Sequence, residues 1–548
     1  MDLRTRWADD VDPDTPLPEY PRPQLRRPRW TNLNGRWDLA VTGRDDRAPT
    51  AYPEQIVVPF PAGSLLSGVD RVIGPDDRLW MRRTFRAPDL ADDERLRLHF
   101  GAVDWECEVW CNEQWVGVHR GGFDPFHLDL TGSVDERAEH ELIVAVSDPT
   151  DTGTQPVGKQ TLNPFAIQYT AVAGIWQTVW LEPVPAACVE RMVATTSITD
   201  ERVTVRVTVD GGRRGDRIVA AAATDGSEAA VGEAPVVAGA ATVELDIADL
   251  RLWSPDDPHL YDLRVELRRG ADTLDDVAGY FGAREIAADR DADGVWRLML
   301  NGAPIFHLGL LDQGWWPDGL YTAPTDEALA FDIEISKAMG FNTIRKHVKV
   351  EPARWYWHAD RLGMLVWQDM PSTRFDMVEF GRQLSEGIAP ADMDWSAVSP
   401  GRDPAVFRRE LDAMIDALIP FPSIVVWVPF NESWGQHDTD ATLSHVARRD
   451  PTRLVDGPSG WVDTGTGHIR DHHVYQQEAE LPPLDDTRPL VYGEYGGLKL
   501  AVEGHVARDD GWGYADTSTP DELAEAYAEL TAVIEGLVDR GLAGAIYT

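Results

Sequence analysis

The sequence predicts a multidomain protein in which two β-sandwiches precede a (β/α)8 barrel, so that β and α/β domains share one chain. Three observations support this prediction. The chain has 548 residues, more than a single hydrophobic core organises. Apolar and polar residues alternate in short strands through its first half, whereas strands alternate with helical patterns after residue 282. The first pattern is typical of antiparallel sheets and the second of parallel βα units.

The first half divides into two sandwiches. Residues 30–184 contain short alternating strands, one of which carries Cys107 and Cys111 on one face, and this pattern is typical of an antiparallel sandwich. Residues 185–282 repeat the pattern in simpler form, with an Asp-Gly-Gly turn after residues 203–209. This second unit predicts a small immunoglobulin-like sandwich without the cysteine pair of antibody domains.

The second half predicts eight parallel strands. An amphipathic helix that is capped by Thr325 and ends at Gly340 follows the first strand. Eight parallel strands with such connections close a (β/α)8 barrel. The predicted strands are residues 304–310, 341–345, 363–369, 424–430, a strand beginning at 454, 472–475, 490–493 and 544–548.

These units set the expected domain boundaries at residues 1–184, 185–282 and 283–548. The eighth strand reaches Thr548, the last residue of the sequence, so we expect a barrel that lacks its final helix. A truncated reading frame is the favoured interpretation, and cover supplied from elsewhere is the alternative. Truncation predicts reduced stability and weak or absent activity.

The composition excludes several classes of partner. The formal net charge is −41, and this charge repels nucleic acid and anionic membranes. No apolar run approaches the roughly 18 residues that span a bilayer, and the first ten residues lack the apolar segment of a secretory signal. We therefore expect a cytoplasmic protein.

The cysteines and histidines do not predict a metal site. Cys107 and Cys111 lie about 13 Å apart if the strand is extended, which is too far for a disulfide, so both are expected to fill the core. The side chains of the adjacent pair His472-His473 diverge on a strand and form a poor chelate. We predict neither a metal nor a cofactor.

Two glutamates follow hydrophobic strands. Residues 424–430 form an apolar run that ends in Asn431 and Glu432, and residues 490–493 precede Glu494. Because the C-terminal ends of parallel strands form the mouth of a barrel, we expect both carboxyls there. One carboxyl that protonates a leaving oxygen and another that attacks the anomeric carbon would cleave a glycosidic bond. The alternative for each glutamate is a salt-bridged residue at the barrel rim.

Five motifs in order along the chain resemble glycoside hydrolase family 2, the family of β-galactosidases, β-glucuronidases and β-mannosidases. The resemblance implies a jelly-roll sugar-binding domain, an immunoglobulin-like domain and a TIM barrel, with hydrolysis that retains the anomeric configuration. Besides Asn431-Glu432, the motifs are Thr-Asn-Leu-Asn-Gly-Arg-Trp at residues 31–37, Gly-Ile-Trp-Gln-Thr-Val-Trp-Leu-Glu at 174–182, Leu-Asn-Gly-Ala-Pro-Ile at 300–305 and Gly-Phe-Asn-Thr-Ile-Arg at 340–345.

The resemblance also implies roles for individual residues. Glu432 would be the acid/base and Glu494 the nucleophile, and Asn431 would hold the sugar 2-hydroxyl. Since the acid must be protonated at working pH, we expect burial and the charge of Glu494 to raise the pKa of Glu432. Arg345 matches the family arginine that favours ionised Glu494, with a structural ion pair as the alternative. Tyr475 matches a tyrosine that hydrogen-bonds the nucleophile, with a core aromatic as the alternative.

Further candidates are expected around the sugar. Trp367 is expected either to stack on a sugar face or to pack inside the barrel, and Asp369 to accept hydrogen bonds from hydroxyls. Trp434 belongs to a predicted βα loop, where it is expected to contribute to an aromatic wall for sugars. Tyr547 takes the place of the family's tryptophan on strand eight.

The identity of the sugar does not follow from these motifs. The residues after strands one and two depart from the β-galactosidase pattern, and the Asn-x-Lys pattern of β-glucuronidases is not found after strand seven. We predict a retaining exo-β-glycosidase of small oligosaccharides or glycosides, with β-galactosidase-like activity as the first choice. The alternatives are β-mannosidase, β-glucuronidase or furanosidase activity, transglycosylation, and a catalytically silent carbohydrate-binding protein. The expected partner is a carbohydrate, and homo-oligomerisation stays open.

Overall fold

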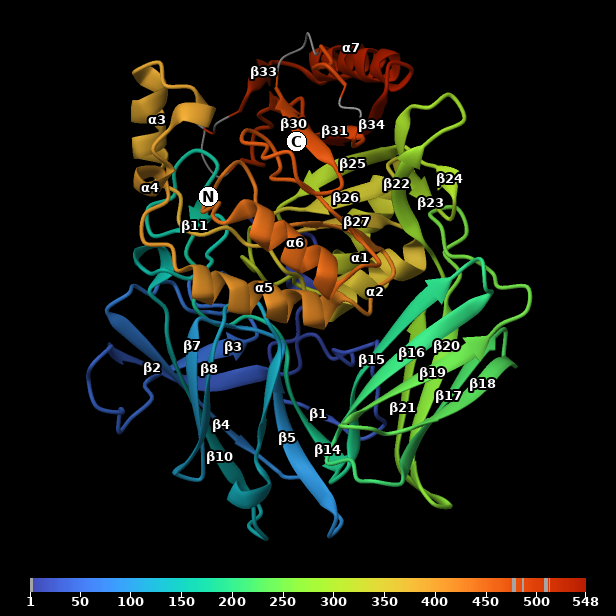
Figure 1. Cartoon of the computed structure of the whole chain (residues 1–548). Coiled ribbons are helices and arrows are strands. Elements are labelled where there is room, and N and C mark those ends of the chain that lie inside the picture. The colour runs from blue at the N-terminus through green and yellow to red at the C-terminus, as the bar shows by residue number, and fades with distance from the viewer. Residues whose placement is uncertain (1–2, 476–479, 485–486, 507–510, 512) are drawn as a thin grey trace.

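The computed structural model describes residues 3–475, 480–484, 487–506, 511 and 513–548. Two β-rich units lie side by side beneath a third unit that contains the long helices (Figure 1). None of the helices in the described ranges combines the length and the apolar character that crossing a membrane requires.

The first unit is a sandwich of two antiparallel sheets. Strand alternation places apolar side chains such as Trp37, Phe100 and Cys107 between the sheets, where they are almost fully buried. The prediction of an antiparallel sandwich in this region is therefore confirmed. One sheet has the order β1 (Thr31–Asn32), β14 (Val179–Pro185), β5 (Glu94–Phe100) and β9 (Phe126–Asp129), and the other has the order β3 (Glu54–Val58), β2 (Gly35–Gly43), β4 (Asp77–Phe85), β10 (His140–Ser147), β7 (Glu106–Cys111) and β8 (Gln114–Arg120).

The second unit is a smaller sandwich with an apolar core that includes Val205 and Val265. The buried Arg27 joins it to the first sandwich, because its guanidinium donates to Asp275 of the second at 2.7 Å and to Glu182 of the first at 3.1 Å. One sheet contains β15 (Cys188–Ser197), β16 (Arg202–Asp210) and β19 (Ala240–Asp246), and the other β18 (Ser227–Pro235), β17 (Asp216–Thr224), β20 (Tyr261–Arg269) and β21 (Asp272–Phe281).

The third unit is a barrel of eight parallel strands, as predicted. A parallel bridge between Asp456 and Ile469 joins the fifth strand to the sixth and closes the barrel. In chain order the strands are β25 (His307–Asp312), β26 (Thr343–Lys346), β27 (Leu365–Asp369), β28 (Ile424–Val428), β29 (Leu454–Val455), β30 (Arg470–Val474), β31 (Leu490–Tyr495) and β34 (Leu542–Tyr547).

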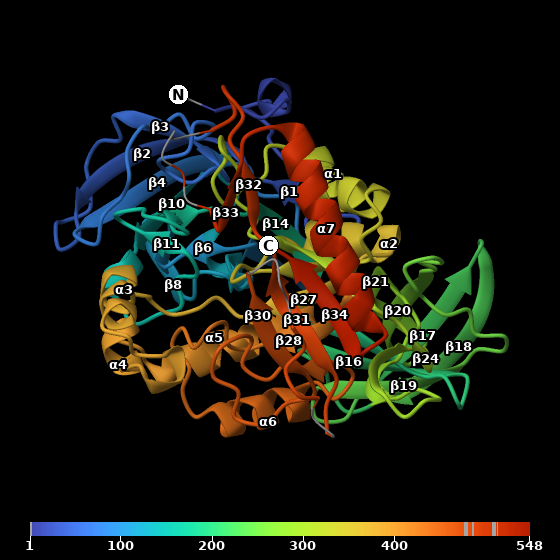
Figure 2. The ribbon, with the colours of Figure 1, turned by 90° about the horizontal axis from the view of Figure 1, so that it is seen from above.

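Helices cover only part of the barrel. The predicted first helix is confirmed, and the Thr325 side chain caps it by accepting a hydrogen bond from the Ala328 amide. No helix follows β29, where the connection is rich in glycine, contains Pro458 and is therefore poor in helix propensity. The helices are α1 (Asp326–Ala338), α2 (Ala353–Leu362), α3 (Met377–Ser385), α4 (Trp395–Val398), α5 (Pro404–Leu418), α6 (Thr439–Arg449) and α7 (Pro520–Val538). Seen from above, α7 runs beside β34 (Figure 2).

Further short strands belong to the first sandwich and to the barrel. Three of them, within residues 286–304, form an antiparallel sheet. Leu298 and Leu300 of this sheet pack with Trp367 of the barrel interior. These short strands are β22 (Ile286–Arg290), β23 (Trp296–Leu300) and β24 (Ala303–Pro304), together with the pairs β6 (Val103–Asp104) with β13 (Gly174–Ile175), β11 (Gln160–Thr161) with β12 (Tyr169–Thr170) and β32 (Leu498–Leu500) with β33 (Ala515–Thr517).

The first sandwich docks directly on the barrel. Helix α5 lies along the boundary between the two units (Figure 1), and the Trp105 indole of the sandwich donates to Glu410 of this helix at 3.0 Å. A sandwich loop also crosses to the barrel, where the amides of Val157 and Gly158 donate to the Ser372 carbonyl at 2.8 and 2.9 Å. The sandwich loop is thereby fixed beside the connections that leave the ends of the barrel strands.

Candidate active site

Two strand ends place Glu432 and Glu494 at one mouth of the barrel. Pro429 follows β28 and ends its ladder because proline has no amide hydrogen to donate. The chain then turns sharply, with Glu432 at a φ of +47°, and the Glu432 amide donates to the Ser459 carbonyl at 2.8 Å. Glu494 lies on β31 itself. Both side chains are buried, with exposed fractions of 6% and 5%.

The two carboxyl groups form a close pair. A carboxylate oxygen of Glu432 and one of Glu494 lie within 4.8 Å of each other. The Tyr475 hydroxyl bridges them, 2.8 Å from Glu432 Oε1 and 2.8 Å from Glu494 Oε2. Burial, followed by the charges of both glutamates, raises the pKa of Tyr475, so the phenol keeps its proton. Double displacement needs two carboxyl groups about 5 to 5.5 Å apart, and oxygens within 4.8 Å of each other agree with that arrangement.

Arg345 lies beneath the two carboxyl groups and contacts residues on several strand ends. It is fully buried, and it binds both oxygens of Asp369 at 3.0 Å while its Nη1 lies 3.7 Å from Glu494 Oε1. Burial opposes its charge, but the charges of Asp369 and Glu494 outweigh burial and raise the pKa of Arg345. Arg345 Nη2 also donates to Asn431 Oδ1 at 2.7 Å. The Asn431 Nδ2 group, in contrast, has no hydrogen-bond partner among the described residues.

A residue that sequence reasoning missed contacts Glu432. His473 Nδ1 lies 2.9 Å from Glu432 Oε1, and His473 Nε2 lies 2.8 Å from Ser459 Oγ, which donates to Asp471 Oδ2 at 2.5 Å. Burial opposes the charge of His473, but the charge of Glu494, the nearby carboxylate of Asp471 and the hydrogen bond to Glu432 raise the pKa of His473 to about 10. His473 is therefore charged at neutral pH and donates from both ring nitrogens. The period-two alternation of β30 places it on the same face as Tyr475, and this signal could have identified it.

The expected pKa of Glu432 was wrong in direction. Burial raises it, as expected, but the hydrogen bond and charge of His473, the Tyr475 hydroxyl and the charge of Lys159 together lower the pKa of Glu432 below its ordinary value. The proton that the pair shares therefore rests on His473 rather than on Glu432 in this arrangement. The positive charges of His473 and Lys159 thus outweigh the burial that was expected to raise the pKa of Glu432.

The structure shows protein contacts for three residues that were expected around the sugar, and for Trp367 these agree with the predicted alternative of packing inside the barrel. Trp367 is fully buried, and its indole donates to His307 Nδ1 at 2.9 Å inside the barrel. Asp369 is fully buried and uses its oxygens for Arg345 and for His347, whose Nδ1 lies at 2.8 Å. Tyr547 lies on the α7 side of β34, where it packs edge-on against Tyr527 at a ring distance of 5.2 Å. A contact of these residues with a sugar stays a prediction.

Trp434 lies close to the mouth but is almost fully buried. Its ring stacks on Phe375 at a centroid distance of 4.1 Å. Lys159 Nζ approaches the Trp434 ring, 5.9 Å from its centroid. Lys159 belongs to the first sandwich and was not predicted, since no local pattern shows that a distant loop reaches the barrel.

A metal would compete with the chemistry of this pair. Glu432, His473 and Glu494 each offer a ligand atom, and these atoms lie within 4.8 Å of one another. Imidazole and carboxylates are ligands that Zn²⁺ accepts. A cation held there would occupy both carboxyls, so it would block double displacement rather than assist it. The predicted absence of a metal stays a prediction.

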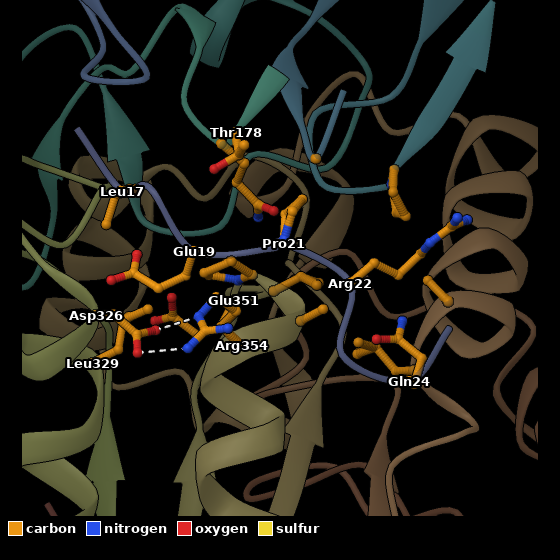
Figure 3. Close-up of a pocket in the computed structure, with 18 of the residues that line it drawn as sticks. Leu17, Glu19, Pro21, Arg22, Gln24, Thr178, Asp326, Leu329, Glu351 and Arg354 are labelled. Atoms are coloured by element: carbon orange, nitrogen blue, oxygen red, sulfur yellow. Dashed lines mark hydrogen bonds and ion pairs between the residues drawn. The ribbon is translucent and has the colours of Figure 1, made fainter. Parts of the chain in front are cut away.

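A separate pocket lies between the first sandwich and the barrel helices (Figure 3). The N-terminal segment crosses it with Leu17, Glu19 and Arg22, and the ion pair of Asp326 with Arg354, at 2.7 Å, lies at its barrel side. Neither carboxyl of the close pair lines this pocket. The barrel mouth is therefore the candidate active site.

The fold and the site together define a barrel hydrolase in which two β-sandwiches precede a barrel with a paired carboxylate at its mouth. Sequence comparison identifies the group. Residues 71–185 match the sugar binding domain, residues 186–284 the central domain and residues 322–508 the TIM barrel domain of the glycosyl hydrolases family 2. The chain belongs to the glycosyl hydrolases family 2 and is a glycoside hydrolase, as the five motifs predicted.

Individual relatives extend this result. A β-glucuronidase of Streptococcus agalactiae is 23% identical over 528 residues, which cover 87% of this chain and 84% of that protein. A β-glucuronidase of Bifidobacterium dentium, solved with coumarin-3-O-glucuronide, superposes with a TM-score of 0.75 at 19% identity, over 96% of this chain and 91% of the other. The β-glucuronidase of Ruminococcus gnavus gives a TM-score of 0.73 at 16% identity, over 96% and 92% of the two chains. The two structures share the fold of this chain.

Proposed function

We propose that this protein is a retaining β-glycosidase that hydrolyses β-glucuronides. The close pair of Glu432 and Glu494, with oxygens within 4.8 Å, is the observation that carries the retaining mechanism. Similarity to the β-glucuronidase of Streptococcus agalactiae over most of both chains supports the choice of sugar. β-Galactosidase-like activity, the first choice from the sequence, stays an untested alternative.

The first step would form a glycosyl–enzyme bond. Glu494 attacks the anomeric carbon while the bond from that carbon to the leaving oxygen breaks, and the leaving oxygen takes a proton from Glu432. Arg345, 3.7 Å from Glu494 Oε1, places a positive charge beside the nucleophile. The Tyr475 hydroxyl, 2.8 Å from Glu494 Oε2, fixes its orientation.

The proton for this step would come from the pair of Glu432 and His473. His473 Nδ1 lies 2.9 Å from Glu432 Oε1, so one proton moves between them without a change in their summed charge. In the second step a water molecule gives a proton back to this pair and attacks the anomeric carbon, and the bond to Glu494 breaks. The enzyme then returns to its starting protonation state.

Asn431 would act on the sugar 2-hydroxyl. Its Oδ1 is held by Arg345 at 2.7 Å, so the side chain cannot flip, and its Nδ2 has no partner among the described residues. An amide fixed in this way donates to an oxygen of the sugar without reorganisation. The contact strengthens as positive charge develops on the ring in the transition state.

The test is a panel of aryl β-glycosides combined with two variants. We expect turnover of the 4-nitrophenyl β-glucuronide, and proton magnetic resonance should show the β-anomer as the first product. Glu494→Gly should lose activity and, with azide, form the α-glycosyl azide, because azide replaces the nucleophile on its own face. Glu432→Ala with azide and a 2,4-dinitrophenyl substrate should form the β-azide. An inverted first product, or no turnover of any glycoside, would overturn the proposal.

A further inference from the structure

Lys159 is placed in the active site by the first sandwich. The preceding Gly158 has a φ of +62°, and a Cβ at this position would lie 2.5 Å from the Val348 carbonyl oxygen, so only glycine permits this approach. The Gly158 amide donates to Ser372 at 2.9 Å, and the Lys159 carbonyl accepts from the Tyr169 amide at 2.9 Å. Backbone contacts on both sides therefore fix the position from which the lysine side chain extends.

The Lys159 ammonium approaches the Trp434 ring but has no anionic partner in the described parts of the chain. The residue is 6% exposed, and Nζ makes neither a hydrogen bond nor an ion pair with any described residue. The other two lysines of this region differ. Lys346 binds Asp312 at 2.6 Å and Glu351 at 2.9 Å, and Lys349 binds Glu351 at 3.0 Å. A buried cation without an anion costs free energy, so Lys159 is suited to receive one.

The Lys159 side chain lies beside the segment that carries Glu432, because its Nζ is 5.9 Å from the centre of the Trp434 ring. Burial lowers the pKa of Lys159, and the charges of Glu494 and Glu432 oppose that effect. Its own charge in turn contributes to lowering the pKa of His347, after burial. Lys159 thus interacts electrostatically with groups on or after several barrel strands, although it belongs to the first sandwich.

The other cations at the barrel mouth are already paired with anions, so Lys159 is available to the substrate. Arg345 is held by Asp369 at 3.0 Å, and His473 by Glu432 at 2.9 Å. The remaining nearby anion, Glu494, is the nucleophile of the proposed reaction and must stay available. Without Lys159 the mouth would repel an anionic sugar, whereas one lysine admits one negative charge.

We propose that Lys159 binds the carboxylate of the glycone and makes the active site selective for uronides. This inference rests on the proposed function, since it names the residue that would recognise the acid group. A carboxylate fits better than a phosphate, because a dianion would meet both glutamates with only one free cation to balance it. The first sandwich would thereby supply a specificity determinant to the barrel.

The test compares charged and neutral sugars in Lys159→Met, which keeps an unbranched side chain of similar length and removes its charge. For the parent we expect 4-nitrophenyl β-glucuronide and β-galacturonide to be preferred over the β-glucoside and β-galactoside. In the variant kcat/KM for both uronides should fall about 100-fold, while the neutral glycosides change less than about threefold. Lys159→Arg should recover part of the uronide activity. The matched control is Lys499→Met, because the Lys499 ammonium already pairs with Asp516 at 3.4 Å. It should leave the preference unchanged.

Equal losses on all four sugars would overturn the proposal and assign Lys159 to the balance of charge at Glu494. Hydrolysis of neutral glycosides alone by the parent would also overturn it while leaving the glycosidase intact. Binding supplies an independent readout if turnover is absent. Calorimetry with the 4-nitrophenyl 1-thio-β-glucuronide and the matching thioglucoside should show a preference for the acid that Lys159→Met abolishes, and an unchanged preference would count against the lysine.

Discussion

Tyr475 shows how protons are distributed at the scale of single residues. A phenol carries one hydrogen, yet its oxygen lies 2.8 Å from both Glu432 and Glu494. It therefore donates to one carboxylate at a time. The other carboxyl needs a separate donor, and His473, 2.9 Å from Glu432, is that donor. The acid of the proposed reaction is thus a pair of residues that shares one proton.

His473→Gln should move the alkaline limb of the pH–rate profile to lower pH. In the parent the shared proton is held by a histidine whose pKa is raised to about 10, so it is retained as pH rises toward that value. In the variant the proton is lost at the pKa of Glu432 alone, whose ordinary value is 4.5. We expect the apparent pKa of the alkaline limb in kcat/KM to decrease by more than about one pH unit.

A substrate with a 2,4-dinitrophenolate leaving group provides the control, because its departure needs no proton. The parent and His473→Gln should then show similar alkaline limbs. A variant whose profile on ordinary aryl glycosides matches that of the parent would show that His473 only packs beside Glu432.

Asn431→Ala should cost activity through one hydroxyl of the sugar. Arg345 fixes the amide at 2.7 Å, and removal of a fixed donor to the transition state typically costs about 100-fold to 1,000-fold in rate. The same loss should appear when the parent acts on a 2-deoxy glycoside, and the two losses should not add. Additive losses would place Asn431 against another part of the substrate.

At the scale of elements, the regular pattern of the sequence predicted most of the architecture. The eight barrel strands were predicted because buried parallel strands are apolar runs bounded by turns. The same pattern led to Glu432 and Glu494, since each follows or belongs to such a run. It also contained His473, which shares a strand face with Tyr475, although the residue was not selected.

What the sequence did not reveal depends on contacts between distant elements. Trp367 and Asp369 lie within a strand whose end was known, but their depth in the barrel follows from packing against residues such as Leu298. Lys159 reaches the mouth only because its loop binds Ser372. No local sequence pattern records either contact, so neither could be derived from one sequence without knowledge of the tertiary contacts.

Gly158→Ala should disturb this loop without unfolding the barrel. The added Cβ would lie 2.5 Å from the Val348 carbonyl oxygen, and a strained backbone at positive φ costs about 1 to 3 kcal/mol. We expect kcat/KM to fall as Lys159 shifts. Gly226→Ala is the matched control, because Gly226 has a φ of +76° with nothing within 4 Å of an added Cβ. Equal activity of both variants would mean that the loop tolerates displacement.

At the scale of the whole molecule, the first sandwich and the barrel are in direct contact, and both contribute side chains to the site. The sandwich contributes Lys159 to the mouth, and Trp105 contacts α5 on the other side of the boundary. The contact with α5 includes a buried acid. Burial, opposed by the Trp105 hydrogen bond, raises the pKa of Glu410 to about 8.

Glu410→Gln should therefore stabilise the protein at alkaline pH relative to the parent. A carboxyl with a raised pKa binds its proton more tightly in the folded state, so the parent loses stability as pH rises from the ordinary value of 4.5 through about 8. Glutamine keeps the acceptor for Trp105 and cannot ionise. The Tm of the variant minus that of the parent should increase between about pH 5 and about pH 9 by several degrees. A difference that stays constant over this range would show that Glu410 ionises in the folded protein as it does in water.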